Sequence, residues 1–192
     1  MACAGLIALA SLIPGSALRR QGRDQPRFAD AGVPTTLLQT SFYWENFISF
    51  GMGPRRGEDG KLVLTLPMND KKLPSMAAED IGKCAYGIFK RGEELIGNTV
   101  SVAGDHVTGE RMASAFSRAL GEDVSYFAVP HDIYRGFGFP GADDLGNMFQ
   151  FKCMFEDYYC GVRDLAGSRS LNPDLLTFDA WLDKNAGSIS IG

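Results

Sequence analysis

The sequence has little basic charge. Its 192 residues include 19 Lys and Arg against 23 Asp and Glu, which leaves a net charge of -4 at pH 7. Proteins that bind nucleic acids usually concentrate Lys and Arg on one face. The basic pairs here are isolated, namely Arg19-Arg20, Arg55-Arg56 and Lys71-Lys72. Each pair is typical of a solvated loop, and we expect no nucleic-acid partner.

Histidine and cysteine are also scarce. The 2 histidines, His106 and His131, stand far apart in the chain, and no Cys-x-x-Cys pair occurs. Without clustered ligands a zinc site is not expected. The 4 cysteines are Cys3, Cys84, Cys153 and Cys160. In a chain of this length they do not make a disulfide scaffold, so we predict reduced and mostly buried thiols.

Long hydrophobic runs are missing as well. The sequence has no stretch of about eighteen consecutive apolar residues, which argues against a membrane span. The motifs G-x-S-x-G and H-E-x-x-H are absent, so hydrolase chemistry has neither its nucleophile nor its metal site. We therefore predict no catalytic residues and no metal.

The start of the chain resists assignment. Residues 2–17 are apolar and end in Gly15-Ser16-Ala17, which suits signal-peptide cleavage, but residues 1–12 contain no Lys or Arg. Cleavage would also leave three cysteines, an odd number for an exported protein. We interpret residues 1–27 as an unmatched segment that replaces a lost N-terminal half, through natural truncation or an incomplete gene model. We expect a cytoplasmic protein, with the nucleus as an alternative.

The rest of the chain predicts alternating helices and strands. With 45% hydrophobic and 22% charged residues, it can form one domain with a real core. A helix ends at 28–32, and strands are expected at 34–40, 61–66, 99–103 and 124–129. Helices are expected at 77–90 and 108–120, then in the aromatic region after Pro130 and from Thr177 onward. Thr108 and Thr177 are the predicted N-caps, and Gly121 ends its helix. This alternation favours an α/β fold whose strand at 34–40 lies in a parallel sheet.

A site is expected where the first of these strands ends. An apolar run through Leu37-Leu38 breaks directly into the aromatic and polar residues 41–47. In open α/β folds, ligands lie beyond the carboxyl ends of the strands. The side chains that follow this strand are therefore placed where a cofactor would be met.

Two motifs match known signatures in their letters but not in their context. Residues 136–141 match the letters G-x-G-x-x-G, but no strand precedes them, because Tyr134-Arg135 belongs to a short predicted helix. We expect a tight turn between helices rather than a phosphate site. Tyr86 and Lys90 have the Tyr-x-x-x-Lys spacing of catalytic short-chain dehydrogenases, in which the lysine lowers the pKa of the phenol. They lie on a helix that follows a different strand, so we expect a half-packed tyrosine and a lysine at the helix end.

From about residue 28 onward, several words together resemble the NmrA-like family, atypical relatives of the short-chain dehydrogenases. These words are Ala31-Gly32-Val33-Pro34-Thr35-Thr36, Tyr43-Trp44-Glu45-Asn46, Asp80-Ile81-Gly82, Gly138-Phe139-Pro140-Gly141-Ala142, Asn147-Met148-Phe149 and residues 175–182. The resemblance implies that residues 28–192 are the C-terminal part of such a domain. Its expected fold is a partial Rossmann-like sheet with a C-terminal helical lobe.

The resemblance also implies a cofactor and its contacts. In that family the aromatic-acid-asparagine word lines the nicotinamide side of NADP(H), which assigns the role to Tyr43, Trp44, Glu45 and Asn46. An aromatic ring can stack on nicotinamide, while amide and carboxylate groups bond its carboxamide or ribose. The G-x-x-G-x-x-G loop that holds the pyrophosphate has no counterpart here, so we expect NADP binding to be weak or lost.

The resemblance leaves two functions open. The first is an NAD(P)(H)-linked redox-sensing or regulatory protein without catalysis, acting through a regulatory protein partner or as a homodimer. The second is an NAD(P)H-dependent oxidoreductase that reduces a quinone or small carbonyl compound. Whether the chain is an enzyme stays open, and the balance favours a regulator.

Overall fold

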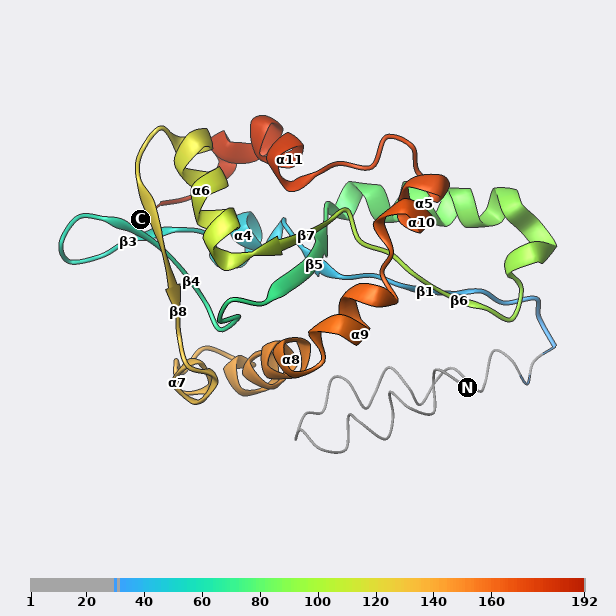
Figure 1. The fold of residues 1–192 in the computed structure, drawn as a ribbon, viewed down its shortest axis with the longest axis horizontal. Coiled ribbons are helices and arrows are strands. Elements are labelled where there is room, and N and C mark those ends of the chain that lie inside the picture. Colours follow the sequence, from blue (N-terminus) through green and yellow to red (C-terminus); the bar gives the residue numbers. More distant parts are fainter. Residues whose placement is uncertain (1–29, 31, 192) are drawn as a thin grey trace.

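Short strands alternate with helices in the computed structural model, which describes residue 30 and residues 32–191 (Figure 1). Residues 1–27, which we interpret as an unmatched segment, lie outside the described residues. Most of the helix end predicted at 28–32 lies outside them as well. The α/β class predicted from the alternation of elements is confirmed.

Three small sheets carry the strands. In the first, β1 (Leu37–Gln39) pairs in parallel with β6 (Thr99–Ser101). In the second, β5 (Lys72–Met76) pairs in parallel with β2 (Phe42–Tyr43) and antiparallel with β7 (Asp105–Thr108). In the third, β4 (Leu62–Leu66) pairs in parallel with β8 (Val124–Ala128) and antiparallel with β3 (Arg55–Arg56). The expected parallel pairing of the first strand is confirmed, and β4, β6 and β8 lie where strands were predicted.

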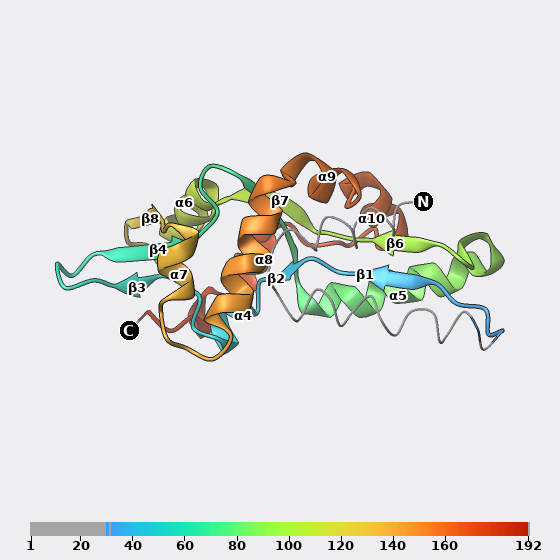
Figure 2. The same cartoon turned by 90° about the horizontal axis from the view of Figure 1, so that it is seen from below.

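Helices cover both sides of these strands. They are α4 (Asn46–Ser49), α5 (Ala78–Arg91), α6 (Gly109–Leu120), α7 (His131–Arg135), α8 (Ala142–Met154), α9 (Glu156–Gly161), α10 (Leu165–Leu171) and α11 (Phe178–Asn185), with short 3-10 helices at Gly92–Leu95 and Ala186–Ser188. Helices α5 and α9 lie on opposite sides of β1 and β6 (Figure 2).

The predicted caps are present. The Thr108 hydroxyl accepts a hydrogen bond from the Arg111 amide at 3.3 Å, and Gly121 ends α6 with a positive φ of 70°. The Thr177 hydroxyl accepts from the Ala180 amide at 3.3 Å at the start of α11. Each cap satisfies an amide that has no partner within its own helix, which is why the sequence signal was local and readable.

The core divides into a larger and a smaller cluster. The larger one contains five packed aromatic side chains: Trp44, Phe47, Phe116, Phe178 and Trp181. The smaller one lies between α5 and α10 and contains Met76, Cys84, Ile88, Val102, Leu171 and Leu175. Cys84 and Cys153 are buried, as predicted, and the three cysteines in the described region are free thiols.

A buried carboxylate links α5 to the segment that leads into α11. Asp80 has no exposed surface, and its oxygens accept hydrogen bonds from the Asn172 amide nitrogen at 3.1 Å and the Leu176 backbone amide at 2.9 Å. The Lys83 ammonium lies 2.9 Å from the same carboxylate. Because a buried carboxylate needs several donors, this side chain fixes α5 against residues 172–176.

Two glycines of α5 provide a matched test of its packing. A Cβ added at Gly87 would overlap the backbone carbonyl of Leu171, whereas one added at Gly82 would meet nothing within 4 Å. We expect Gly87→Ala to lower the free energy of unfolding by about 1–3 kcal/mol through overpacking. Gly82→Ala should raise it by roughly 0.5–1 kcal/mol through helix propensity. Urea unfolding of both variants checks this, and equal effects would contradict the close approach of α5 and α10.

Candidate functional site

The segment that follows β1 places its side chains in alternating directions. Tyr43 ends β2 with 37% of its surface exposed, and its hydroxyl hydrogen-bonds the Thr40 hydroxyl at 2.8 Å. The next residue, Trp44, has no exposed surface. Because neighbouring side chains of an extended chain point to opposite faces, burial of one directs the other outward.

Trp44 is held inside the core. Its indole nitrogen donates to the Ser75 hydroxyl at 2.8 Å, and its ring centroid lies 5.5 Å from that of Phe178 and 6.0 Å from that of Trp181. With the indole fully enclosed, its face is not available for stacking on a ligand. Among the four residues assigned by resemblance, the exposed aromatic ring is therefore that of Tyr43.

Glu45 joins two helices. One carboxylate oxygen accepts from the Ala78 amide at 2.8 Å, and the other accepts from the Trp181 indole nitrogen at 3.1 Å. No side chain of the preceding residue caps α5, so the carboxylate of Glu45 supplies an acceptor at the start of that helix and complements its dipole. Both oxygens of Glu45 are thus committed to the protein framework.

Asn46 begins the one-turn helix α4. Its backbone carbonyl accepts from the amides of Phe50 and Met52, both at 3.2 Å. The structure shows no hydrogen bond from its side-chain amide to any other described residue. The segment therefore separates into Trp44 and Glu45, which anchor it, and Tyr43 and Asn46, whose ring and side-chain amide are not used by the core.

A lysine that the sequence reasoning missed lies beside this segment. Lys152 of α8 is only 5% exposed, and its ammonium lies 5.8, 5.6 and 5.3 Å from the ring centroids of Phe42, Phe149 and Tyr159. The available signal was its position three residues after Phe149, which puts both side chains on one helix face. Nothing in the sequence linked that face to Phe42.

Arg163 fastens the end of α9 to the same segment. Its Nε and Nη2 atoms donate to the Thr40 carbonyl at 3.2 and 3.0 Å, and Nη1 donates to the Tyr159 carbonyl at 3.4 Å. The guanidinium carbon lies 3.8 Å from the centroid of the Tyr159 ring. Thr40 thus contacts Arg163 through its carbonyl and Tyr43 through its hydroxyl, which brings the cation and the exposed ring to one place.

Burial sets the protonation of this cluster. Burial, and after it the positive charge of Arg163, lower the pKa of Lys152 to about 7. Burial raises the pKa of the Tyr159 phenol. The site therefore combines a neutral phenol with an amine that changes charge near neutral pH.

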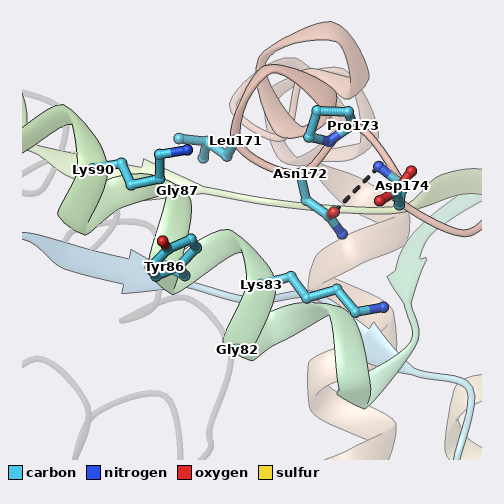
Figure 3. Close-up of a pocket in the computed structure, with 9 residues that line it drawn as sticks. All are labelled: Gly82, Lys83, Tyr86, Gly87, Lys90, Leu171, Asn172, Pro173 and Asp174. Carbon is cyan, nitrogen blue, oxygen red and sulfur yellow. Dashed lines mark hydrogen bonds between the residues drawn. The ribbon is translucent and has the colours of Figure 1, made fainter.

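The Tyr86 and Lys90 pair lies in a different place. Tyr86 is 66% exposed on α5, and the Lys90 ammonium lies 5.6 Å from the centre of its ring. The pair lines an open groove of about 420 Å³ between α5 and residues 171–174 (Figure 3). No residue of 43–46 lines this groove, so the structure does not bring the pair and the segment together.

The glycine-rich loop at 136–141 is a turn between α7 and α8, as predicted. Gly138 and Gly141 have positive φ values of 75° and 86°, a conformation that favours glycine. Within the described chain, no group of three His, Cys, Asp or Glu side chains is arranged to hold a metal ion. Among the residues that the structure describes, no helix has both the length and the apolar character needed to cross a membrane.

Comparison with known proteins identifies relatives over most of the chain. The model of the NmrA-like family matches residues 28–182. An NmrA-like family domain-containing oxidoreductase, lnbB of Aspergillus flavus, is 28% identical over 176 residues, which cover 79% of this chain and 52% of that protein. The chain thus spans about half the length of this curated relative.

Solved structures share the fold. A crystal structure of NmrA, a negative transcriptional regulator in complex with NADP, matches with a TM-score of 0.66 and 21% identity over 83% of this chain and 55% of that chain. An NADPH-dependent quinone oxidoreductase from Escherichia coli matches with a TM-score of 0.69 and 20% identity over 91% of this chain and 63% of that chain. These likenesses confirm the Rossmann-like α/β fold that the resemblance implied.

The link through Glu45 can be tested by mutation. We expect Glu45→Ala to lower the free energy of unfolding by about 1–3 kcal/mol, because the Ala78 amide and the Trp181 indole lose their acceptor. Glu58→Ala removes an exposed acid and serves as the matched control, with an expected change below about 0.5 kcal/mol. Chemical unfolding followed by tryptophan fluorescence measures both. Equal stability of the two variants would contradict the anchoring role of Glu45.

Proposed function

The chain belongs to the NmrA-like family, and from this we propose that it is a regulatory protein that responds to NAD(P)(H) without performing chemistry. The observation that carries the proposal is the exposed Tyr43 ring, followed three positions later by an Asn46 side chain that bonds no described residue, at the carboxyl ends of parallel strands. Nucleotide cofactors of open α/β folds lie at this edge. The NADP-bound NmrA structure with the same fold supports the choice of cofactor.

Each residue of the segment has a part in this proposal. The Tyr43 ring stacks on the nicotinamide, and the Asn46 amide bonds its carboxamide. Trp44 and Glu45 do not touch the cofactor in this proposal. Their indole and carboxylate fix the backbone between Tyr43 and Asn46. Binding is weak, since the sequence offers no G-x-x-G-x-x-G loop for the pyrophosphate.

The protein signals through contact in this proposal. NADPH and NADP differ in the charge of the nicotinamide ring, so a cofactor stacked on Tyr43 presents a different surface in its two redox states. A regulatory protein partner, or a second copy of the chain, reads that surface in the cytoplasm or nucleus. The geometry of Tyr86 and Lys90 supports the absence of chemistry, because the ammonium lies over the phenol ring on a solvent-exposed helix face.

A second candidate is a reductase for a quinone or small carbonyl compound. It is favoured by the likeness to an NADPH-dependent quinone oxidoreductase and by the groove beside Tyr86 and Lys90. In this mechanism the phenol would pass a proton to the substrate oxygen. None of the proposed nicotinamide contacts lines this groove, which makes this candidate the weaker one.

Asn46→Ala tests the cofactor contact. Loss of one hydrogen bond should weaken NADPH binding by about 1–3 kcal/mol and leave the melting temperature without ligand nearly unchanged. Ser49→Ala, on the exposed side of the same short helix, is the control and should bind NADPH like the unaltered chain. Calorimetric titration and thermal melts with and without NADPH provide the measurement. A similar melting shift with and without ligand would remove the proposed role of Asn46.

Tyr86→Phe separates the regulator from the reductase. We expect no NADPH oxidation above background when the unaltered chain is mixed with a panel of quinones. Clear turnover that falls at least about tenfold in Tyr86→Phe would favour the reductase instead, in line with the usual size of general acid catalysis. Lys61→Met removes a lysine that does not line the groove and is the control for nonspecific effects.

A further inference from the structure

Two buried cations lie against the Tyr159 ring, near the carboxyl end of β1, without a matching anion in the part of the chain that the structure describes. Lys152 is 5% exposed and Arg163 is 6% exposed. Among the described residues, neither has a carboxylate within 4 Å. Arg163 is satisfied by backbone carbonyls, and Lys152 by the faces of three aromatic rings. Buried charges are normally paired with an opposite charge, and these two cations lack that partner within the described chain.

The other titratable groups that face Lys152 do not supply negative charge at neutral pH. Burial raises the pKa of Cys153 to about 11, and burial also raises the pKa of Tyr159. Arg163 stays protonated although burial lowers its pKa. The cluster therefore carries one positive charge when Lys152 is neutral and two when it is protonated.

We propose that Lys152 and Arg163 form a binding site for a small organic anion, whose carboxylate or phosphate oxygens lie between the ammonium and the guanidinium. The rings of Phe42, Phe149 and Tyr159 surround the ammonium and favour a ligand whose anionic group is attached to a flat or apolar body. Thr40 bonds both Arg163 and Tyr43, which places this anion beside the exposed tyrosine ring.

Proton uptake accompanies binding at this site. An anion beside Lys152 favours its charged form and so raises its pKa from about 7. At pH 8 the free amine is mostly neutral and takes up a proton on binding, whereas at pH 6 it is already protonated and takes up none. Affinity should therefore be constant below neutral pH and fall as the pH rises above 7. The site does not depend on NADP binding, so it stands even if the proposed cofactor contact fails.

Calorimetry on the full chain tests the site with two probes, benzoate and inorganic sulfate, which are fully ionised at both pH 6 and pH 8. Each is titrated at these pH values in buffers of different ionisation enthalpy, which reports the protons taken up by the protein. We expect at least one probe to bind, with uptake at pH 8 and none at pH 6. Binding of benzoate alone identifies a carboxylate ligand, and binding of sulfate alone identifies a ligand with a tetrahedral oxyanion such as a phosphate.

Two variants of Lys152 make the test decisive. Lys152→Met should weaken binding about 10- to 100-fold and abolish proton uptake, because a charge-assisted hydrogen bond is lost. Lys152→Arg keeps a permanent charge, so it should still bind at pH 8 but without proton uptake. Lys61→Met removes an exposed lysine and should leave binding and uptake unchanged.

An anion site at Lys152 and Arg163 is contradicted if neither probe binds the unaltered chain, or if Lys152→Met binds as tightly as that chain. Binding at pH 8 without proton uptake would also overturn it. Thermal melts check the fold of Lys152→Met, which should melt no lower than the unaltered chain because a buried charge has been replaced by an apolar side chain of similar length. If Lys152→Met does not fold, Lys152→Arg decides, and loss of its binding at both pH values contradicts the site.

Discussion

Burial of the Trp44 indole is the constraint on which the arrangement of this protein depends. Its ring packs with aromatic side chains of α11, and its nitrogen is bonded to Ser75 of β5. These contacts fix the backbone just after β2. The directions of the adjacent side chains follow from that of the indole. Tyr43 faces outward for this reason. Displacement of the indole would therefore disturb the core and the candidate site together.

The candidate site is assembled from distant parts of the chain. The segment after β1 supplies an exposed ring and the Thr40 carbonyl, while α8 and the residues just after α9 supply the cations. Thr40 connects these parts, because its carbonyl accepts from Arg163 and its hydroxyl bonds the Tyr43 hydroxyl. The sequence motif at 43–46 thus supplies only part of the site, and α8 and the residues after α9 supply the rest.

Sequence reasoning succeeded where the signal was local. The caps at Thr108 and Thr177 and the apolar periodicity of α5 and α6 depend on residues within one or two turns. It failed for β5 and β7, which no prediction placed. Pro74 has no amide to donate to the sheet, yet it pairs with β7 at a position before the pairing with β2 begins, so the missing amide is tolerated. The ring cluster around Lys152 was not predicted because Phe42 lies more than a hundred positions from Phe149 and Tyr159 in the sequence.

The same long-range pairing governs how this chain reaches its fold. Leu37 lies beside Thr99 and Leu62 beside Val124, so the parallel pairs form only after long intervening loops have closed. Loop closure costs entropy before any pairing contact repays it, and topologies of this kind fold slowly. Helices α5 and α6 lie within those loops and can form early. The parallel edges should then join late, which leaves partly paired strands exposed to association while the chain is being synthesised.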